Sequence, residues 1–330
     1  MGPRASGGTI VDGLLRGLKF GIIASNDSHQ GYPGCWGLGL MGLYAEELTR
    51  EALFEAIRAR RAYGVTGDRI DLWFEVDGLF MGQAAETPGS GAVRAGWRVV
   101  GCDALDRVEL VRNGRVIQAY HHFFDGRSWR GGRLKLRLEV GWGPDRADGF
   151  KCPRKRWDGA LEVQGGRVVS VEPCFTMPGN EVVVQGSKAR LRLTTYQRDT
   201  AVRGRPTEQG AIFELDCSRD ARVLLSIDGR EHAFGLQELL SGTALFVQYE
   251  GIKGIIAEQF GVQESSVENP DVYYHNAWKY RLRRAVPAAG YEAEGEFVDR
   301  DPPTGESFYY LRVFQTNGQA AWSSPVWVRR

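Results

Sequence analysis

The feature that most constrains this chain is a set of dipeptides, each an Asn or Asp followed by Gly, that separate short apolar runs. They are Asp77-Gly78, Asn113-Gly114, Asp228-Gly229 and Asn317-Gly318, with Gly165-Gly166 as a fifth candidate turn. Both central residues of a type I′ turn need positive φ, and this turn matches the twist of two antiparallel strands. The pattern therefore predicts a mainly β fold after about Gly67, with antiparallel hairpins stacked as sandwiches.

The residues before Gly67 follow a different pattern. Residues 9–18 repeat an apolar side chain every four positions after Thr9, and residues 49–61 form a helical pattern after Thr49, with arginines crowding its end. We therefore expect a short N-terminal α/β segment over residues 1–66. Two β-rich regions are expected after it, over 67–175 and 176–330. Within the second, residues 236–260 fit either helix or strand.

An apolar run in the first segment ends abruptly in Asp-Ser-His. Gly21 to Ser25 is predicted to be a buried strand, because it contains two adjacent β-branched residues and begins with glycine. Asp27 and His29 follow it, and residues two apart in extended backbone point to the same side. A carboxylate oxygen and an imidazole nitrogen suit a divalent metal ion. The alternative is a plain turn, in which the aspartate accepts backbone N–H groups.

Further blocks follow this motif along the chain. They are the glycine-rich Gly31-Tyr32-Pro33-Gly34, the stretch from Leu48 to Ile70, and the closing blocks Phe308–Val313 and Ala321–Trp327. Together they resemble the end of the catalytic domain of PHP-type (polymerase and histidinol phosphatase) metal-dependent phosphoesterases, in an uncharacterised branch with a β-rich C-terminal region. The resemblance implies a distorted barrel of βα units that binds two or three metal ions. It also implies phosphoester hydrolysis, with Asp27 and His29 as metal ligands.

The chain departs from that family in one respect. PHP ligand sets begin with an early His-x-His, and none of the five histidines here forms one. About twenty residues precede Gly21, whereas such a barrel needs roughly 200. The resemblance therefore implies the remnant of a barrel, in which most of the catalytic body is absent. Zinc, manganese or iron would bind weakly to this chain alone. A separate chain or a second copy would complete the barrel.

Composition narrows the possible partners and the compartment. The net charge is +1, so no general field favours nucleic acid or an anionic membrane. No apolar run reaches the roughly 18 residues of a membrane span. The five cysteines have neither zinc-site nor redox spacing, and free thiols indicate a reducing, cytoplasmic compartment. We expect neither a nucleic-acid nor a membrane partner.

Two functions are consistent with these features of the sequence. The first is a C-terminal fragment or subunit of a PHP-type metal-dependent hydrolase, incomplete for catalysis alone, with no catalytic or substrate-binding residue assigned. The second is a non-catalytic β-sandwich module that binds a partner or a carbohydrate, because aromatic rings recur along the strands. Adjacent His121 and His122 are expected on opposite faces of a strand, one packed and one exposed. His232 and His275 are expected to be structural.

Overall fold

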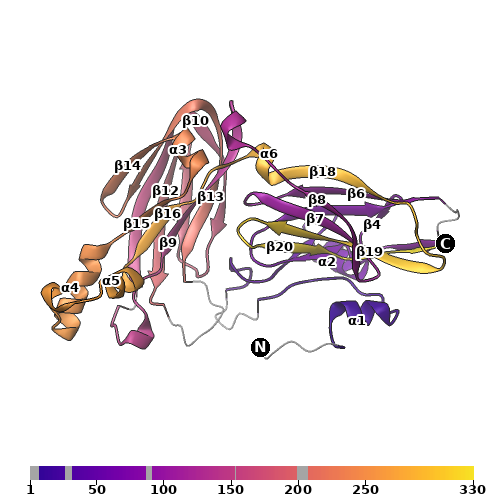
Figure 1. Cartoon of the computed structure of the whole chain (residues 1–330), viewed down its shortest axis with the longest axis horizontal. Helices are drawn as coiled ribbons and strands as arrows, with labels where there is room; N and C mark the ends of the chain where they lie inside the picture. The colour runs from indigo at the N-terminus through magenta and orange to yellow at the C-terminus, as the bar shows by residue number, and fades with distance from the viewer. Residues whose placement is uncertain (1–6, 27–31, 87–90, 153, 199–206) are drawn as a thin grey trace. The chain divides into compact units, whose positions relative to one another are not determined.

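The computed structural model describes residues 7–26, 32–86, 91–152, 154–198 and 207–330 (Figure 1). These residues divide into two compact units. The first collects those within 1–27, 39–124 and 289–330, and the second those within 28–38 and 125–288. The chain is mainly β with antiparallel sheets, as the turn pattern predicts. None of the described helices has both the length and the apolar character that crossing a bilayer requires.

The first unit is a sandwich of two sheets. Its elements are α1 (Ile10–Leu15), β1 (Leu40–Leu43), α2 (Arg50–Arg58), β2 (Ala62–Val65), β3 (Asp71–Val76), β4 (Leu79–Phe80), β5 (Ala84–Glu86), β6 (Val93–Val100), β7 (Leu105–Arg112), β8 (Arg115–His121), α6 (Ala288–Tyr291), β18 (Glu292–Asp299), β19 (Glu306–Gln315), β20 (Ala320–Ser323) and β21 (Val326–Arg329). One sheet has the order β1-β2-β20-β19-β21-β5, with β7 and β8 added beside β19. The other has the order β18-β6-β3-β4.

Alternation along the strands builds the core of this sandwich. In β3, Leu72, Phe74 and Val76 are fully buried, while the residues between them are half-buried on the outer face. The inner residues of β3 and β6 join those of β7, β19 and β21 in one apolar cluster. The side-chain period of two in an extended strand is the cause, since it places every second residue in the core.

The second unit is built on one large sheet. Its elements are η1 (Gly126–Ser128), β9 (Gly131–Gly141), η2 (Arg146–Asp148), β10 (Arg154–Cys174), β11 (Glu181–Gln185), β12 (Lys188–Tyr196), β13 (Gln209–Ile227), β14 (Arg230–Gly235), α3 (Leu236–Ser241), β15 (Ala244–Val247), α4 (Tyr249–Phe260), η3 (Glu264–Ser266), α5 (Asp271–Asn276), β16 (Lys279–Leu282) and β17 (Val286–Pro287). The strand order is β11-β12-β10-β13-β9-β16-β15, with β14 beside β13 and β17 beside β9. Figure 1 shows the long strands β10 and β13 running through this unit.

These two long strands change partners midway. The first part of β10 pairs with β12, while the first part of β13 pairs with β9 and its last part with β14. Strands β9 and β12 are separated by two strands, β10 and β13, in the sheet order, yet they approach one another. The sheet therefore curls around a single apolar cluster, to which α3 contributes Leu236, Leu239 and Leu240.

The predicted hairpins are confirmed at four of the five sites. Asp77-Gly78, Asn113-Gly114 and Asp228-Gly229 have positive φ at both residues and join β3–β4, β7–β8 and β13–β14. Asn317-Gly318 joins β19 to β20 with positive φ at the glycine alone. Gly165-Gly166 was wrongly predicted as a turn, because it lies inside β10 at a shift in register against β13. A glycine with positive φ, here Gly165, also suits a bulge, which bends a strand and lets it continue.

Two further expectations are resolved by the structure. Residues 236–260 contain both kinds of element, since the helices α3 and α4 flank the strand β15. The compact units do not follow the expected segments 1–66, 67–175 and 176–330. The reason is long-range pairing: β2 lies beside β20, and β10, which ends before residue 175, pairs with β13, which begins after it. A sequence pattern detects turns, whereas strand partners far apart in the chain decide where a unit ends.

We expect Gly166→Ala to destabilise the second unit. An added Cβ would collide with the Cβ of Cys217 on β13 and lie 2.7 Å from the carbonyl oxygen of Asp216. Overpacking of this kind costs about 1–3 kcal/mol. The measurement is the urea midpoint followed by far-UV circular dichroism. The control is Gly254→Ala in α4, where nothing lies within 4 Å and alanine favours the helix. Equal midpoints for Gly166→Ala and the wild type would contradict the close packing at the bulge.

Candidate functional site

The predicted ligands Asp27 and His29 lie outside the described residues, whereas the segment from Gly21 to Asn26 that leads to them is described. The prediction of a strand at Gly21–Ser25 is wrong, because this segment has no strand conformation. Ile22 is buried, but Ile23 is 58% exposed. The reason is that β2 already pairs with β1 on one edge and with β20 on the other. No edge of β2 is left for this segment to join.

The segment instead crosses a face of the sheet, where two glycines admit it. A Cβ added to Gly64 on β2 would lie 3.0 Å from the backbone nitrogen of Ala24. A Cβ added to Gly39, just before β1, would lie 2.6 Å from the carbonyl oxygen of Ser25. Contacts this short are possible only without a side chain. The backbone shortly before Asp27 is therefore packed directly against the paired strands β1 and β2.

A buried serine near the C-terminus fixes the other end of this segment. The backbone N–H of Ile22 donates to Ser324 Oγ over 2.8 Å, and that hydroxyl donates to the carbonyl oxygen of Ala62 over 2.5 Å. Ser324 has no exposed surface. One hydroxyl thus links the segment, β2 and the turn between β20 and β21. This role has no signal in the sequence, since the partners are far apart in the chain.

The helix before β2 ends in a turn that also depends on glycine. Arg60 has φ +58°, which is uncommon for a residue with a side chain. Its Nε donates to the carbonyl oxygen of Gly82 over 2.9 Å, and its guanidinium lies 5.6 Å from the centre of the Trp327 ring. A side chain on Gly82 would collide with the backbone of Arg60. This arginine therefore holds the end of α2 in place.

Downstream of the motif, the described part of the glycine-rich loop is fastened within the second unit. The backbone N–H of Trp36 donates to the carbonyl oxygen of Phe175 over 2.8 Å. The Arg137 guanidinium lies 5.4 Å from the centre of the Trp36 ring. Both Trp36 and its neighbour Cys35 are buried. Buried residues therefore lie on each side of the Asp-Ser-His motif, with Ile22 before it and Cys35 and Trp36 after it.

The four remaining histidines do not gather into a site. His121 is exposed and His122 half-buried, as expected, with His122 Nε2 2.7 Å from the carbonyl oxygen of Ala289. His232 Nε2 lies 2.8 Å from the Tyr280 hydroxyl, and burial lowers the pKa of this imidazole. His275 is exposed on α5. Across the described ranges, no three His, Cys, Asp or Glu side chains are grouped as a metal site requires.

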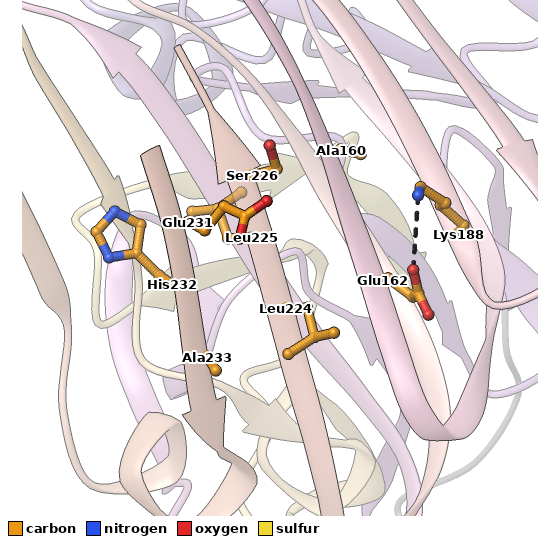
Figure 2. A pocket seen from close by; sticks show the side chains of 9 residues that line it. All are labelled: Ala160, Glu162, Lys188, Leu224, Leu225, Ser226, Glu231, His232 and Ala233. Carbon is orange, nitrogen blue, oxygen red and sulfur yellow. Dashed lines mark ion pairs between the residues drawn. The ribbon is translucent and has the colours of Figure 1, made fainter. Parts of the chain in front are cut away.

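A shallow hollow of about 290 Å³ lies on β10, β12, β13 and β14 of the second unit (Figure 2). It is open because Ala160, Ser226 and Ala233 are small. Lys188 and Glu162 form an ion pair of 3.6 Å on one side of it, and Figure 2 shows the His232 ring on the other side. Since the charged pair is satisfied and the imidazole is engaged with Tyr280, this hollow offers few groups to a ligand.

Comparisons with known proteins match part of the chain. A family model described as a protein of unknown function (DUF3604) matches residues 36–83, which include Gly39, Gly64 and Gly82. An uncharacterised protein of Chlamydia pneumoniae is 35% identical over 129 residues, which are 36% of this chain and 20% of that protein. An uncharacterised protein of Chlamydia muridarum is 29% identical over 132 residues, 34% of this chain and 20% of the relative. The chain spans about a fifth of the length of these relatives.

Among solved structures, the chain was compared with BcpA, the major pilin subunit of Bacillus cereus. The sequence identity is 9%, and the match covers 80% of this chain and 66% of the pilin chain. The TM-score is 0.12, so the likeness supports no argument about fold or function.

We expect Ser324→Ala to loosen the segment that leads to Asp27. The change leaves the buried N–H of Ile22 without its acceptor, which costs about 1–3 kcal/mol. Hydrogen exchange of peptides that contain Ile22 should become faster, and the urea midpoint of the first unit should fall. Ser241→Ala, at an exposed hydroxyl on α3, is the control and should stay within about 0.5 kcal/mol of the wild type. Unchanged exchange at Ile22 would show that the serine does not hold the segment.

Proposed function

We propose that this chain is part of a PHP-type metal-dependent hydrolase, in which Asp27 and His29 are two of several metal ligands. The observation that carries the proposal is the packing of residues 22–25 against Gly39, Gly64 and Ser324. A metal ligand must be held to within a fraction of an ångström. A backbone packed up to Ser25, two residues before the aspartate, helps to meet that need, whereas a simple connecting turn does not require it.

The length comparison supports a site completed by residues outside this chain. A catalytic zinc normally has three protein ligands, and two ligands leave most of the coordination shell to water. The remaining ligands would come from the rest of a longer protein, from a separate chain, or from a second copy of this one. Bound there, zinc, manganese or iron would activate water and stabilise charge on a phosphoryl oxygen. The role of this chain would be to supply one carboxylate and one imidazole to that site.

Metal binding tests the ligand assignment. In equilibrium dialysis, the purified chain should take up Mn²⁺ or Zn²⁺ weakly, and the Asp27→Ala, His29→Ala double variant should lose that uptake. Gly39→Ala should weaken binding several-fold, because its Cβ would displace Ser25. Gly8→Ala is the matched control, since nothing lies within 4 Å of Gly8. Equal uptake by the wild type and the double variant would remove Asp27 and His29 as ligands.

Activity tests the incompleteness of the site. With added manganese, zinc or iron, the chain alone should hydrolyse a generic aryl phosphate no faster than the double variant does. Metal-dependent turnover that the double variant abolishes would overturn this expectation. It would mean that two copies of the chain, or residues here treated as structural, supply the missing ligands.

A further inference from the structure

The outer face of the four-stranded sheet in the first unit carries side chains that the core does not use. Strand register places Trp73, Arg98 and Glu294 in one row across β3, β6 and β18. The next row consists of Glu75, Gly96 and Glu296. The glycine therefore lies between two carboxylate-bearing residues and diagonal to the tryptophan.

The missing side chain at Gly96 opens a hollow on this face. Its volume is about 710 Å³, and Trp73, Arg98, Glu294 and Glu296 contribute to its lining. Small-molecule sites commonly have volumes of about 300–1,000 Å³. A Cβ added to Gly96 would lie 3.4 Å from Glu75 Cγ, which is an ordinary contact. Close packing on this side of the sheet therefore does not require a glycine at position 96.

The charged groups in the hollow are of both signs. Glu296 pairs with Arg94 over 2.5 Å. In contrast, the side chains of Arg98 and Glu294, and that of Glu75 beside Gly96, make no hydrogen bond or ion pair with any residue that the structure describes, although Arg98 and Glu294 are opposite each other in the register. A cationic ligand would meet the guanidinium and an anionic ligand the carboxylates. A neutral ligand with many hydroxyls suits both, since a hydroxyl donates to a carboxylate and accepts from a guanidinium.

Trp73 supplies the apolar part of the same hollow. Its indole is half-buried on the outer face, with the Phe80 ring 6.0 Å away between centroids. A large flat ring at a partly wet surface offers contact area at low conformational cost, with one polar edge. The hollow in the second unit lacks such a ring among its outward-facing residues.

From this combination we infer that the outer face of β3, β6 and β18 binds a neutral carbohydrate. A sugar ring lies over Gly96 with its C–H face against Trp73, while Glu75, Glu294 and Arg98 bond its hydroxyls. This inference stands apart from the metal site, since it uses none of the residues 21–29. A competing explanation for the acidic side chains is protection of β18, which is an edge strand of its sheet. That explanation accounts for the glutamates and leaves Trp73 and Gly96 unexplained.

Affinity electrophoresis of the full chain tests the inference. Native gels contain xylan, galactomannan, soluble starch or hydroxyethylcellulose, and a gel with poly-lysine tests for a cationic partner. At least one polysaccharide should retard the wild type. Trp73→Ala should weaken that binding by at least about tenfold, whereas Trp73→Phe should keep most of it. Gly96→Val should abolish binding by filling the hollow, while it favours the strand.

Two controls separate binding from folding. Ala233→Val fills the hollow of the second unit and should leave the retardation unchanged. Far-UV circular dichroism should show Gly96→Val folded, so a loss of binding in that variant cannot come from unfolding. Retardation by none of the four polysaccharides would overturn the inference, as would retardation that both Trp73→Ala and Gly96→Val retain. Salt-sensitive retardation by poly-lysine alone would assign the face to a cationic partner instead.

Discussion

The pairing of β2 with β20 is the constraint on which the first unit depends. It joins Tyr63 to Ser323 and Val65 to Ala321 across most of the chain length. Residues 125–288 are therefore an insertion, since the chain leaves the sandwich before them and returns to it after them. The chain leaves the first unit after Phe124 and re-enters it at Ala289. The His122 side chain links these two places, because its Nε2 lies 2.7 Å from the carbonyl oxygen of Ala289. Such long-range pairing is entropically expensive and needs a large buried core to offset it.

The same pairing determines the path of the residues before Asp27. With both edges of β2 occupied, residues 22–25 cross a face of the sheet, and glycines at 39 and 64 leave the space. The closing block of the sequence then contributes Ser324 to the same place. The blocks at the two ends of the chain thus meet in one structural unit.

The charged side chains of the chain differ in whether they have partners. In the second unit, Glu139 is buried and held by Arg281 and Arg283. Burial acts to raise the pKa of this carboxyl, but the two guanidinium groups lower it below its ordinary value. On the outer face of β3, β6 and β18, by contrast, Arg98 and Glu294 face each other without forming an ion pair. Opposite charges left unpaired beside an indole ring are the property that separates this face from a merely solvated one.

Local chemistry was enough to predict much of the secondary structure. Thr9 and Thr49 cap α1 and α2 as expected, because a threonine hydroxyl accepts an N–H in the first turn whatever lies beyond it. The Asn-Gly and Asp-Gly turns depend only on which residues tolerate positive φ. The sequence also pointed to a mainly β fold and to the Asp27–His29 pair, which remains a proposal.

What the sequence alone did not determine is where non-local partners lie. A glycine pair occurs both in turns and in bulges. Only the pairing with β13 shows that β10 continues through Gly165-Gly166. An apolar run such as Gly21–Ser25 predicts a strand. The structure shows that both edges of the neighbouring strand β2 are already paired, one with β1 and the other with β20. The hydrogen bond from Ile22 to Ser324 and the row of Trp73, Arg98 and Glu294 likewise depend on how distant strands pair. Only the tertiary structure decides these features, because strand pairing and packing join residues with no relation in sequence.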